Sequence, residues 1–325
     1  MPENESSLTI EKSGIRIDGL CKTYKGGKVK ALNELSVSIE AGEAFGIIGP
    51  NGAGKTTLFG CLLSFLRPDK GTITIDGMPP DALEVRKLVG YLPERLNFDK
   101  WMTGREFMHF HHELSGLPRD VRLSRCDELL TRVGLDPTSW TRPIKKYSRG
   151  MLQRLGFAQA LVGNPKYLLL DEPASGVDPA GVLLLRRLLK ELKSSGVTII
   201  LNSHQLDQVE KTCDRVAFIQ QGKVNGIENL QAGPAHDTRF LVRWTGFESQ
   251  IHVDLSALFA RHGANLIESQ PEYCIFVPSG IDTIASILKE MLTEGYAIIQ
   301  LTPEENRLER YFDGESKKSP EDKSG

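Results

Sequence analysis

Hydrophobic and polar residues alternate along the first part of the chain, as they do in strands with one buried face. The segments "GIRIDGL", residues 14–20, and "LNELSVSIEAG", residues 32–42, follow this pattern and predict two strands. The apolar run "EAFGIIG", residues 43–49, predicts a third strand that ends in a glycine-rich turn. The apolar-periodic "LFGCLLSFL", residues 58–66, follows that turn and predicts a helix.

Two later apolar runs, "KYLLLDEP" at residues 166–173 and "GVTIILNSH" at residues 196–204, predict further strands. From about residue 95 to 145 the spacing becomes helical, in "TGREFMHFHHELSG" and "RDVRLSRCDELLTRVG". These patterns predict a group of helices inserted into the strand-rich core. Another helix is predicted within and after "KKYSRGMLQR", residues 145–154. Its buried face is expected at Leu152, Leu155, Phe157, Ala158 and Leu161.

The composition changes after residue 227, and a linker is predicted at residues 228–237. Residues 238–313 are predicted to form a second, small domain of the α+β class. Its elements follow the order β-α-β-β-α-β, which is typical of a ferredoxin-like sandwich. They are expected at residues 238–244, 254–262, 264–268, 272–277, 281–294 and 296–302. The polar ends, residues 1–9 and 314–325, have little to bury and are expected to be disordered.

The turn after the third strand reads "GPNGAGKTT", residues 49–57, and matches the P-loop pattern G-x-x-x-x-G-K-[ST]. Gly52 and Gly54 permit the backbone angles that turn several N–H groups inward, where they can surround phosphates. Lys55 is then placed to reach the β- and γ-phosphates, and the Thr56 hydroxyl to bind Mg²⁺. An accidental glycine turn would not explain the whole motif between a strand and a helix.

Two acidic residues end the strand at residues 166–173, at the edge where open α/β sheets bind ligands. Asp171 suits a water-mediated hold on Mg²⁺, and Glu172 suits a general base that polarises an attacking water. A strand-ending turn would explain an isolated Asp-Glu pair. Here, however, "SGVDP" follows directly, and a second apolar strand is expected to end in Ser203 and His204. The His204 imidazole can donate to a γ-phosphate oxygen.

Composition and charge limit the other possibilities. The chain has 325 residues, long enough for two domains. Its formal net charge is -2, which gives little electrostatic drive toward nucleic acid, so no nucleic-acid partner is expected. Five scattered cysteines without a CxxC pair indicate neither a disulfide framework nor a zinc site. His109, His112 and Glu113 share a helical face, but three such side chains without a fourth ligand are more typical of an ordinary helix.

No segment at the N-terminus has the basic start and apolar core of a signal peptide. No window approaches the roughly 18 apolar residues of a membrane span. A role at a membrane is therefore expected to require a partner.

Five motifs occur in the order found in the ATP-binding-cassette (ABC) ATPases, and the chain resembles that family over about residues 10–227. They are "GPNGAGKTT" as Walker A, "YSRGMLQR" as the signature, "LLLDEP" as Walker B, "SGVDP" as the D-loop and "NSH" with the switch histidine. The resemblance implies an α/β fold, a P-loop NTPase (RecA-like) ABC ATPase core. That core would carry an antiparallel β-subdomain and an inserted helical subdomain at about residues 95–160.

The resemblance also implies a role for each motif residue. ATP and Mg²⁺ are the implied cofactors, and Glu172 and His204 the implied catalytic residues. Thr56, Glu94 and Asp171 are implied at the metal. The residues implied in nucleotide binding are Tyr24, Gly49, Pro50, Asn51, Gly52, Ala53, Gly54, Lys55, Thr56, Thr57, Ser148, Gly150 and Asp178. Tyr24 matches the aromatic residue that stacks on adenine in this family.

In this family, the signature serine and glycine contact ATP held by the Walker A of a second subunit. The residues agree with that assignment, because Ser148 is a good N-cap and the N-terminus of a helix attracts an anion. Gly150 inside the first turn costs roughly 1 kcal/mol relative to alanine, which an ordinary core helix would not explain. The resemblance therefore implies a second nucleotide-binding subunit, and since both halves of the site are intact, a homodimer is expected.

The chain departs from the usual family pattern at two places. The signature reads Tyr-Ser-Arg-Gly-Met where Leu-Ser-Gly-Gly-Gln is usual, and Glu94 replaces the Q-loop glutamine. A carboxylate can approach Mg²⁺ but cannot donate a hydrogen bond when it is ionised. Both departures resemble the subgroup that serves ABC-2-type exporters. The resemblance then implies an integral membrane permease as partner and a position at the cytoplasmic face of the cell membrane.

Two other functions explain parts of the sequence. A soluble ABC-class ATPase could act on a macromolecule such as a ribosome or DNA. Translation-factor members usually carry two cassettes and DNA-repair members insert long coiled coils, whereas this chain shows one cassette and no sustained heptads. A P-loop kinase would leave "YSRGM", "SGVDP" and His204 unexplained. A neighbouring gene that encodes about six apolar spans would favour the exporter.

Overall fold

The computed structural model describes residues 13–24, 26–230, 239–245 and 254–303. Two compact units divide the chain, residues 1–230 and residues 231–325. The ends that were expected to be disordered and most of the expected linker lie outside the described residues.

A six-stranded sheet forms the centre of the first unit, with the strand order β5-β6-β7-β3-β8-β9. Five strands run parallel, and β9 pairs antiparallel with β8. The strands are β3 (Ala44–Ile48), β5 (Val89–Leu92), β6 (Tyr167–Asp171), β7 (Thr198–Asn202), β8 (Arg215–Gln220) and β9 (Lys223–Asn229). Every residue of β3, β6 and β7 is buried, as expected for parallel strands covered on both faces. Their carboxyl ends therefore meet at one edge of the sheet.

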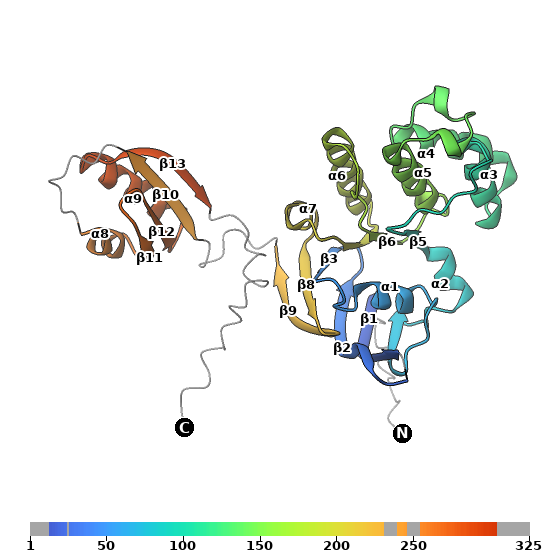
Figure 1. Cartoon of the computed structure of the whole chain (residues 1–325), viewed down its shortest axis with the longest axis horizontal. Coiled ribbons are helices and arrows are strands. Elements are labelled where there is room, and N and C mark those ends of the chain that lie inside the picture. Colours follow the sequence, from blue (N-terminus) through green and yellow to red (C-terminus); the bar gives the residue numbers. More distant parts are fainter. Residues whose placement is uncertain (1–12, 25, 231–238, 246–253, 304–325) are drawn as a thin grey trace, which may run out of the picture. The chain divides into compact units, whose positions relative to one another are not determined.

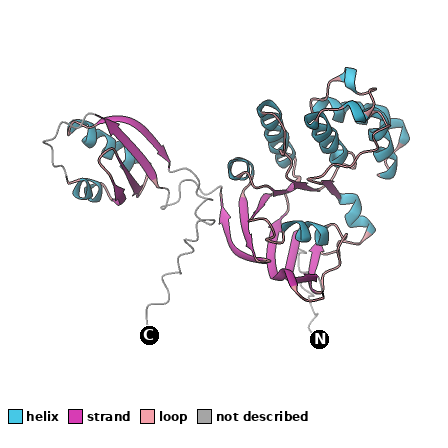
Figure 2. Cartoon of the chain, in the orientation of Figure 1, coloured by secondary structure: helices cyan, strands magenta, loops and turns pink. Residues whose placement is uncertain are grey.

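A three-stranded antiparallel sheet lies beside this core in Figures 1 and 2, with the order β2-β1-β4. Its strands are β1 (Gly14–Tyr24), β2 (Val29–Glu40) and β4 (Lys70–Ile75). Ile15 and Ile17 of β1 belong to the same apolar core as Leu58 and Phe59 of helix α1 (Lys55–Leu62). The helix that begins in the glycine-rich turn is therefore anchored on both sheets.

A hydrogen-bond network ties the turn after β4 to the start of β6. Lys166 Nζ and the Tyr167 hydroxyl each donate to the Asp76 carboxylate over 2.6 Å. The Gly14 backbone N–H donates to the same carboxylate. Burial opposes the ionisation of Asp76, but the hydrogen bonds from Lys166 and Tyr167 outweigh it and hold the pKa of Asp76 below its usual value. One carboxylate thus joins the antiparallel sheet to the central sheet.

Helices occupy the inserted segment, as the periodicity predicts. They are α3 (Gly104–Leu114), α4 (Arg122–Arg132) and α5 (Arg149–Leu161), with short 3-10 turns at Arg119–Val121, Pro137–Ser139 and Ile144–Lys146. Thr103 and Glu106 form a capping box that fixes the start of α3. His112 is buried in this subdomain, and Glu113 pairs with Arg122.

Three more helices complete the first unit: α2 (Leu83–Leu88), α6 (Pro179–Ser194) and α7 (Leu206–Thr212). Asp178 caps α6 by accepting a hydrogen bond from the Gly181 N–H, and a proline occupies the first turn. None of the helices in the described part of the chain is long and apolar enough to cross a membrane.

The second unit has the predicted order β-α-β-β-α-β. Its elements are β10 (Phe240–Thr245), α8 (Leu255–Arg261), β11 (Ala264–Ser269), β12 (Tyr273–Pro278), α9 (Ile281–Thr293) and β13 (Ala297–Pro303). All pairs in the sheet are antiparallel, in the order β11-β12-β10-β13. This is the strand order of a ferredoxin-like sandwich. Its separate core includes Val242, Phe259 and Phe276.

Candidate nucleotide-binding site

The glycine-rich loop lies between β3 and α1, as the P-loop motif requires. Gly54 has a φ of 109°, and a Cβ at this position would lie 2.3 Å from the Ala31 carbonyl oxygen. Only glycine fits there, because both the backbone angle and the contact exclude a side chain. Asn51, Gly52 and Thr56 are exposed at the surface of the loop, and Ala53 is buried beneath it. The loop therefore has the open, glycine-dependent form that can surround a phosphate.

Lys55 turns its ammonium group back toward the loop. Its Nζ donates to the carbonyl oxygens of Gly49, over 2.6 Å, and Pro50, over 3.1 Å. Burial lowers the pKa of Lys55, and the nearby carboxylates of Glu172, Asp171 and Glu94 act in the opposite direction. A lysine cation thus faces the same space as three acidic side chains.

Asp171 ends β6 with its side chain almost fully buried. It lies opposite Asn202 in the register of β6 and β7, and Asn202 Nδ2 donates to its carboxylate over 2.5 Å. Burial raises the pKa of Asp171, and the charges of Glu94 and Glu172 add to this effect, while the hydrogen bond from Asn202 and the charge of Lys55 oppose it. The carboxylate has charged neighbours on several sides, and a bound cation would relieve the repulsion.

The sequence did not single out Asn202 as a site residue. Asn202 is 3% exposed, and its Oδ1 atom has no hydrogen-bond partner among the described residues. The available signal was a polar residue at the last position of a strand that is otherwise apolar. Such a residue needs a partner when it is buried.

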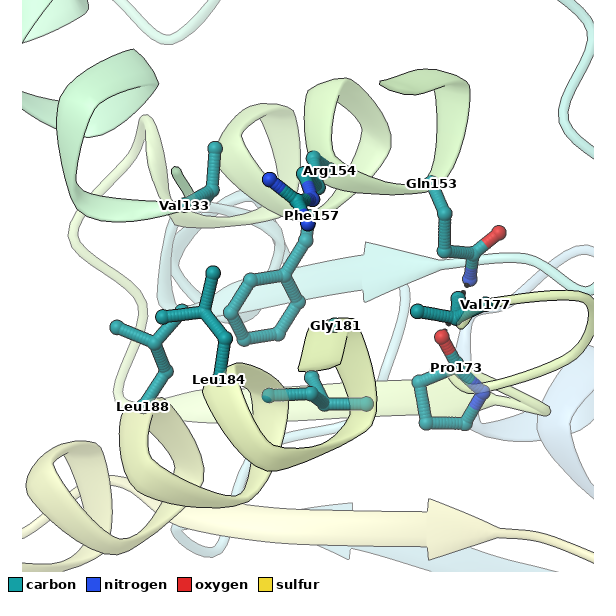
Figure 3. A pocket seen from close by; sticks show the side chains of 10 residues that line it. Val133, Gln153, Arg154, Phe157, Pro173, Val177, Gly181, Leu184 and Leu188 are labelled. Atoms are coloured by element: carbon teal, nitrogen blue, oxygen red, sulfur yellow. Dashed lines mark hydrogen bonds between the residues drawn. The ribbon is translucent and has the colours of Figure 1, made fainter. Parts of the chain in front are cut away.

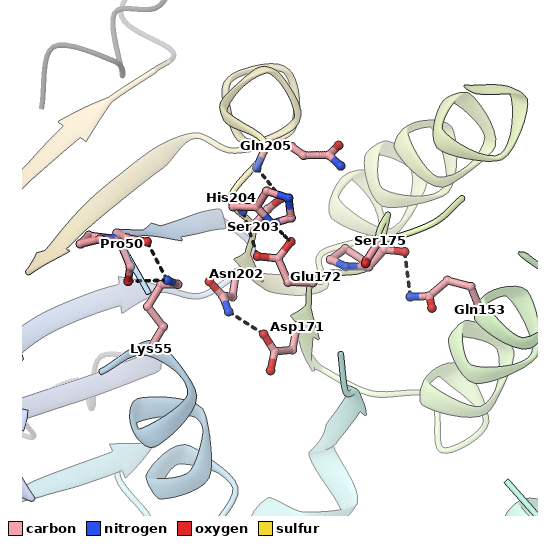
Figure 4. A network of polar contacts seen from close by, with 12 residues as sticks. Pro50, Lys55, Gln153, Asp171, Glu172, Ser175, Asn202, Ser203, His204 and Gln205 are labelled. Atoms are coloured by element: carbon pink, nitrogen blue, oxygen red, sulfur yellow. Dashed lines mark hydrogen bonds and ion pairs between the residues drawn. The ribbon is translucent and has the colours of Figure 1, made fainter. Parts of the chain in front are cut away.

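Glu172 and His204 form a close pair. Glu172 has a φ of 49°, which is unusual for a residue other than glycine, and its backbone N–H donates to the Asn202 carbonyl. One oxygen of its carboxylate accepts a hydrogen bond from the His204 backbone N–H over 2.9 Å. The other oxygen lies 2.7 Å from His204 Nδ1. Figure 4 shows this pair beside Asp171 and Asn202 at the end of β6 and β7.

These residues fit a magnesium nucleotide. No group of three or more His, Cys, Asp or Glu side chains within the described ranges could hold a metal ion alone. Mg²⁺ usually binds through one or two carboxylates together with phosphates and water, so Asp171 and Glu94 supply a sufficient protein contribution. The Lys55 ammonium group and the N-terminus of α1 can supply the complementary contacts to phosphate.

The other expected nucleotide residues lie in three places. Tyr24 ends β1 and is 36% exposed. Ser148 is the N-cap of α5 and accepts a hydrogen bond from the Met151 N–H, which confirms the predicted cap. A Cβ at Gly150 would meet no atom within 4 Å. Among the residues that the structure describes, no hydrogen bond joins Ser148, Gly150 or Asp178 to residues 49–57.

The helix after Ser148 has the predicted buried face. Leu155, Phe157, Ala158 and Leu161 are buried, while Leu152 is only partly buried. Gly150 lies in the first turn of this helix with open space around it, so a ligand can approach the helix terminus closely.

Comparison with known proteins agrees with this geometry. The sequence profile described as "ABC transporter" matches residues 32–175. An uncharacterized ABC transporter ATP-binding protein of Nostoc sp. is 41% identical over 229 residues, which are 69% of this chain and 68% of the relative. The lantibiotic transport ATP-binding protein SrtF of Streptococcus pyogenes is 36% identical over 223 residues, covering 67% of this chain and 94% of the relative.

The first unit also matches solved structures. A dimeric ATP-binding cassette, MJ0796, bound to ADP and Pi in a post-hydrolysis state, has a TM-score of 0.63 and 25% sequence identity. The match covers 67% of this chain and 99% of that cassette. The expected ABC ATPase fold is thus confirmed. Because the P-loop, the acidic strand end and these relatives all agree, the chain belongs to the ABC transporter family and is an ATP-binding ATPase of that family.

Proposed function

We propose that this chain hydrolyses MgATP as the nucleotide-binding subunit of an ABC-2-type exporter. The observation that carries the proposal is the arrangement of Asp171 and the Glu172–His204 pair at the ends of β6 and β7, with Lys55 facing the same space. This arrangement provides a cation for the phosphates, a carboxylate for the metal and a carboxylate for the water.

Each group has one role in the proposed reaction. Lys55 and the loop N–H groups bind and orient the phosphates. Thr56, Glu94 and Asp171 would hold Mg²⁺, which neutralises phosphate charge when it is bound.

Glu172 polarises the attacking water and accepts its proton. Its carboxylate is already held in position by the backbone and the ring of His204. His204 also supplies a donor for the γ-phosphate.

A second copy of the chain would complete each site. Ser148 and Gly150 lie at an open helix terminus and have no described hydrogen bond to residues 49–57 of their own chain. An ATP molecule held by another subunit would meet this terminus in a two-fold sandwich, and the dimeric state of the matched cassette supports that assembly. The signature would thereby act across the interface.

A groove on the first unit supports a membrane partner. It has a volume of about 800 Å³ and lies between the helical subdomain and the sheet core. Phe65, Leu83 and Leu114 line it and are 71%, 62% and 67% exposed. Apolar side chains this exposed are typical of an interaction surface. We assign the groove to a permease, which would place the chain at the cytoplasmic face of the membrane; the name of the lantibiotic transport relative supports this.

The oligomeric state of the Glu172→Gln variant tests the proposed site. We expect a monomer without nucleotide and a dimer with MgATP, measured by size-exclusion chromatography with light scattering. A bulky replacement, Ser148→Arg, in the same background is expected to remove the dimer. A monomer under every condition would overturn the shared site.

The groove is tested separately. In cells that also express a candidate permease, a membrane protein of about six apolar spans from a neighbouring gene, the variant Leu83→Glu is expected to lose co-purification with that protein. ATP hydrolysis by the isolated variant is expected to be unchanged. Leu183→Glu on α6 is the matched control, because Leu183 is 65% exposed and does not line the groove. Equal co-purification of both variants would contradict the assignment of the groove.

A further inference from the structure

The first two turns of α5 bind the segment that follows Glu172. The Arg149 guanidinium donates to Ser175 Oγ over 2.8 Å, and Gln153 Nε2 donates to the Pro173 carbonyl over 2.8 Å. Arg149 and Gln153 are four residues apart and therefore share one face of the helix. Residues 173–176 are thus attached to the signature helix of their own chain.

Gly176 makes room for the arginine. It has a φ of 70°, and a Cβ at this position would lie 2.2 Å from Arg149 Nε. The guanidinium therefore packs directly against the backbone of the turn. Arg149 occupies a position where the usual signature has glycine, so the contact belongs to this form of the motif.

A hollow lies beside this connection. A small, mostly apolar hollow of about 30 Å³, room for about one water, lies between α5 and α6 (Figure 3). Phe157, Val177 and Leu188 are among its lining residues. The hydrogen bond from Gln153 to Pro173 lies at the same hollow in Figure 3. Apolar contact is incomplete at the hollow, and the hydrogen bond from Gln153 to Pro173 adds a polar contact there.

The connection joins residues that belong to different ATP sites. Arg149 directly follows Ser148, which contacts the ATP of the partner in the proposed dimer. Residues 173–176, which accept the hydrogen bonds, directly follow Glu172, which acts on the ATP of its own chain. A shift of the signature turn is therefore passed to the segment behind Glu172 through two side chains, Gln153 at Pro173 and Arg149 at Ser175.

We propose that Arg149 is a positioning residue that links the signature turn to the 173–176 segment of the same chain, and so couples the two ATP sites of the dimer. This inference rests on the proposed function, because it needs two shared sites. Binding of ATP at one site then favours the productive position of Glu172 at the other. Allosteric coupling of this kind typically changes affinity by about 5- to 150-fold.

A direct contact of Arg149 with the partner's ATP is the competing role. In that case the coupling between the sites would depend on the positive charge of residue 149 and would not depend on Ser175. Three variants separate the two roles: Arg149→Ala, Arg149→Lys and Ser175→Ala. Arg187→Ala is the matched control, because Arg187 lies on the exposed surface of α6 with a 70% exposed side chain.

The measurement is the rate of ATP hydrolysis by the full chain as a function of ATP concentration. Arg149→Ala and Ser175→Ala are each expected to lower the Hill coefficient from a value between one and two to about one. Their double variant should behave like either single variant, because both remove the same contact. Arg149→Lys should fail to restore the coupling, since a lysine lacks the planar fork that reaches Ser175 and packs on Gly176.

The outcomes distinguish this inference from the proposed function. An unchanged Hill coefficient in Ser175→Ala together with full rescue by Arg149→Lys would overturn it in favour of direct charge. Arg149→Ala placed in the Glu172→Gln background should still dimerise at saturating MgATP. If Glu172→Gln itself never dimerises, both the proposed function and this inference fail.

Discussion

At the scale of single residues, Glu172 is held by its backbone as well as by its side chain. Its positive φ, its N–H bond to Asn202 and its two contacts with His204 fix the carboxylate before any ligand binds. Preorganised groups lower a barrier because they need no rearrangement in the transition state.

The variant Glu172→Gln should therefore lose catalysis and keep binding. Glutamine has nearly the same shape but cannot accept the proton of the attacking water. We expect kcat to fall about 10²- to 10⁴-fold, measured by phosphate release, with ATP affinity measured by calorimetry unchanged. A parallel loss of ATP affinity would show that Glu172 is needed to build the site.

Asp171 illustrates the cost of a functional carboxylate. Burial raises the pKa of Asp171 in the folded chain. The free energy of unfolding therefore falls as the pH rises from the pKa of Asp171 in the unfolded chain, roughly 4, through its pKa in the folded chain. Above the folded pKa, the full destabilisation remains. Asp171→Asn is thus expected to raise the melting temperature of the nucleotide-free chain at pH 7.

The same variant should lose the stabilisation by ligand. A ligand at 100 times its Kd stabilises a folded chain by about 2.7 kcal/mol, and we expect this gain with MgATP in the wild type but not in Asp171→Asn. Thermal melts at pH 5 and pH 7, with and without MgATP, measure both effects. If the variant kept the full ligand gain, Asp171 would have no role at the metal.

At the scale of elements, local patterns predicted most of the strands and helices. The alternation predicts a strand only over residues 14–20, whereas β1 continues to Tyr24. The reason is physical, because register shifts after Ile17 break the period of two that marks a strand. Short elements such as α2 and β5 have too few residues to show a period.

Contacts between elements that are far apart along the chain could not be predicted from local sequence patterns. Asn202 joins Asp171, and Asp76 joins Lys166 across 90 positions of the chain. No local pattern encodes such pairs, because they depend on the order of the strands in the sheet. The motifs predicted the chemistry of the site, while its supporting hydrogen bonds required the fold.

The Asp76 network gives a prediction at this scale. Asp76→Ala leaves Lys166 and Tyr167 without their acceptor, so we expect a loss of about 1–3 kcal/mol of stability. For the ionised carboxylate, this contribution is fully present above the unfolded pKa, roughly 4, and is lost as the pH falls through the lowered folded pKa.

Urea melts at several pH values provide the measurement. The difference between the wild type and Asp76→Ala should be largest near neutral pH and should shrink in acid. The exposed Asp81→Ala serves as the control, with little change expected at any pH. A constant difference down to pH 2 would show that the ionised form of Asp76 is not what stabilises the network.

At the scale of the whole molecule, the chain consists of two units with separate cores. We expect residues 1–230 to fold alone and to bind ATP with the affinity of the full chain, measured by calorimetry. If the second unit supports the dimer, the shortened Glu172→Gln chain will need a higher concentration to dimerise. Unchanged dimerisation and unchanged ATPase activity would leave the second unit without that role.

The order β6-β7-β3 in the central sheet has one more consequence. One strand separates the acidic strand end from the strand that leads into the glycine loop, so the two lie two strand spacings apart, roughly 9–10 Å. Main-chain hydrogen bonds set this spacing, and they are the same whichever side chains the strands carry. Substitutions along β7 can therefore change the side chains between the ends of β6 and β3, while the distance between these two strand ends stays the same.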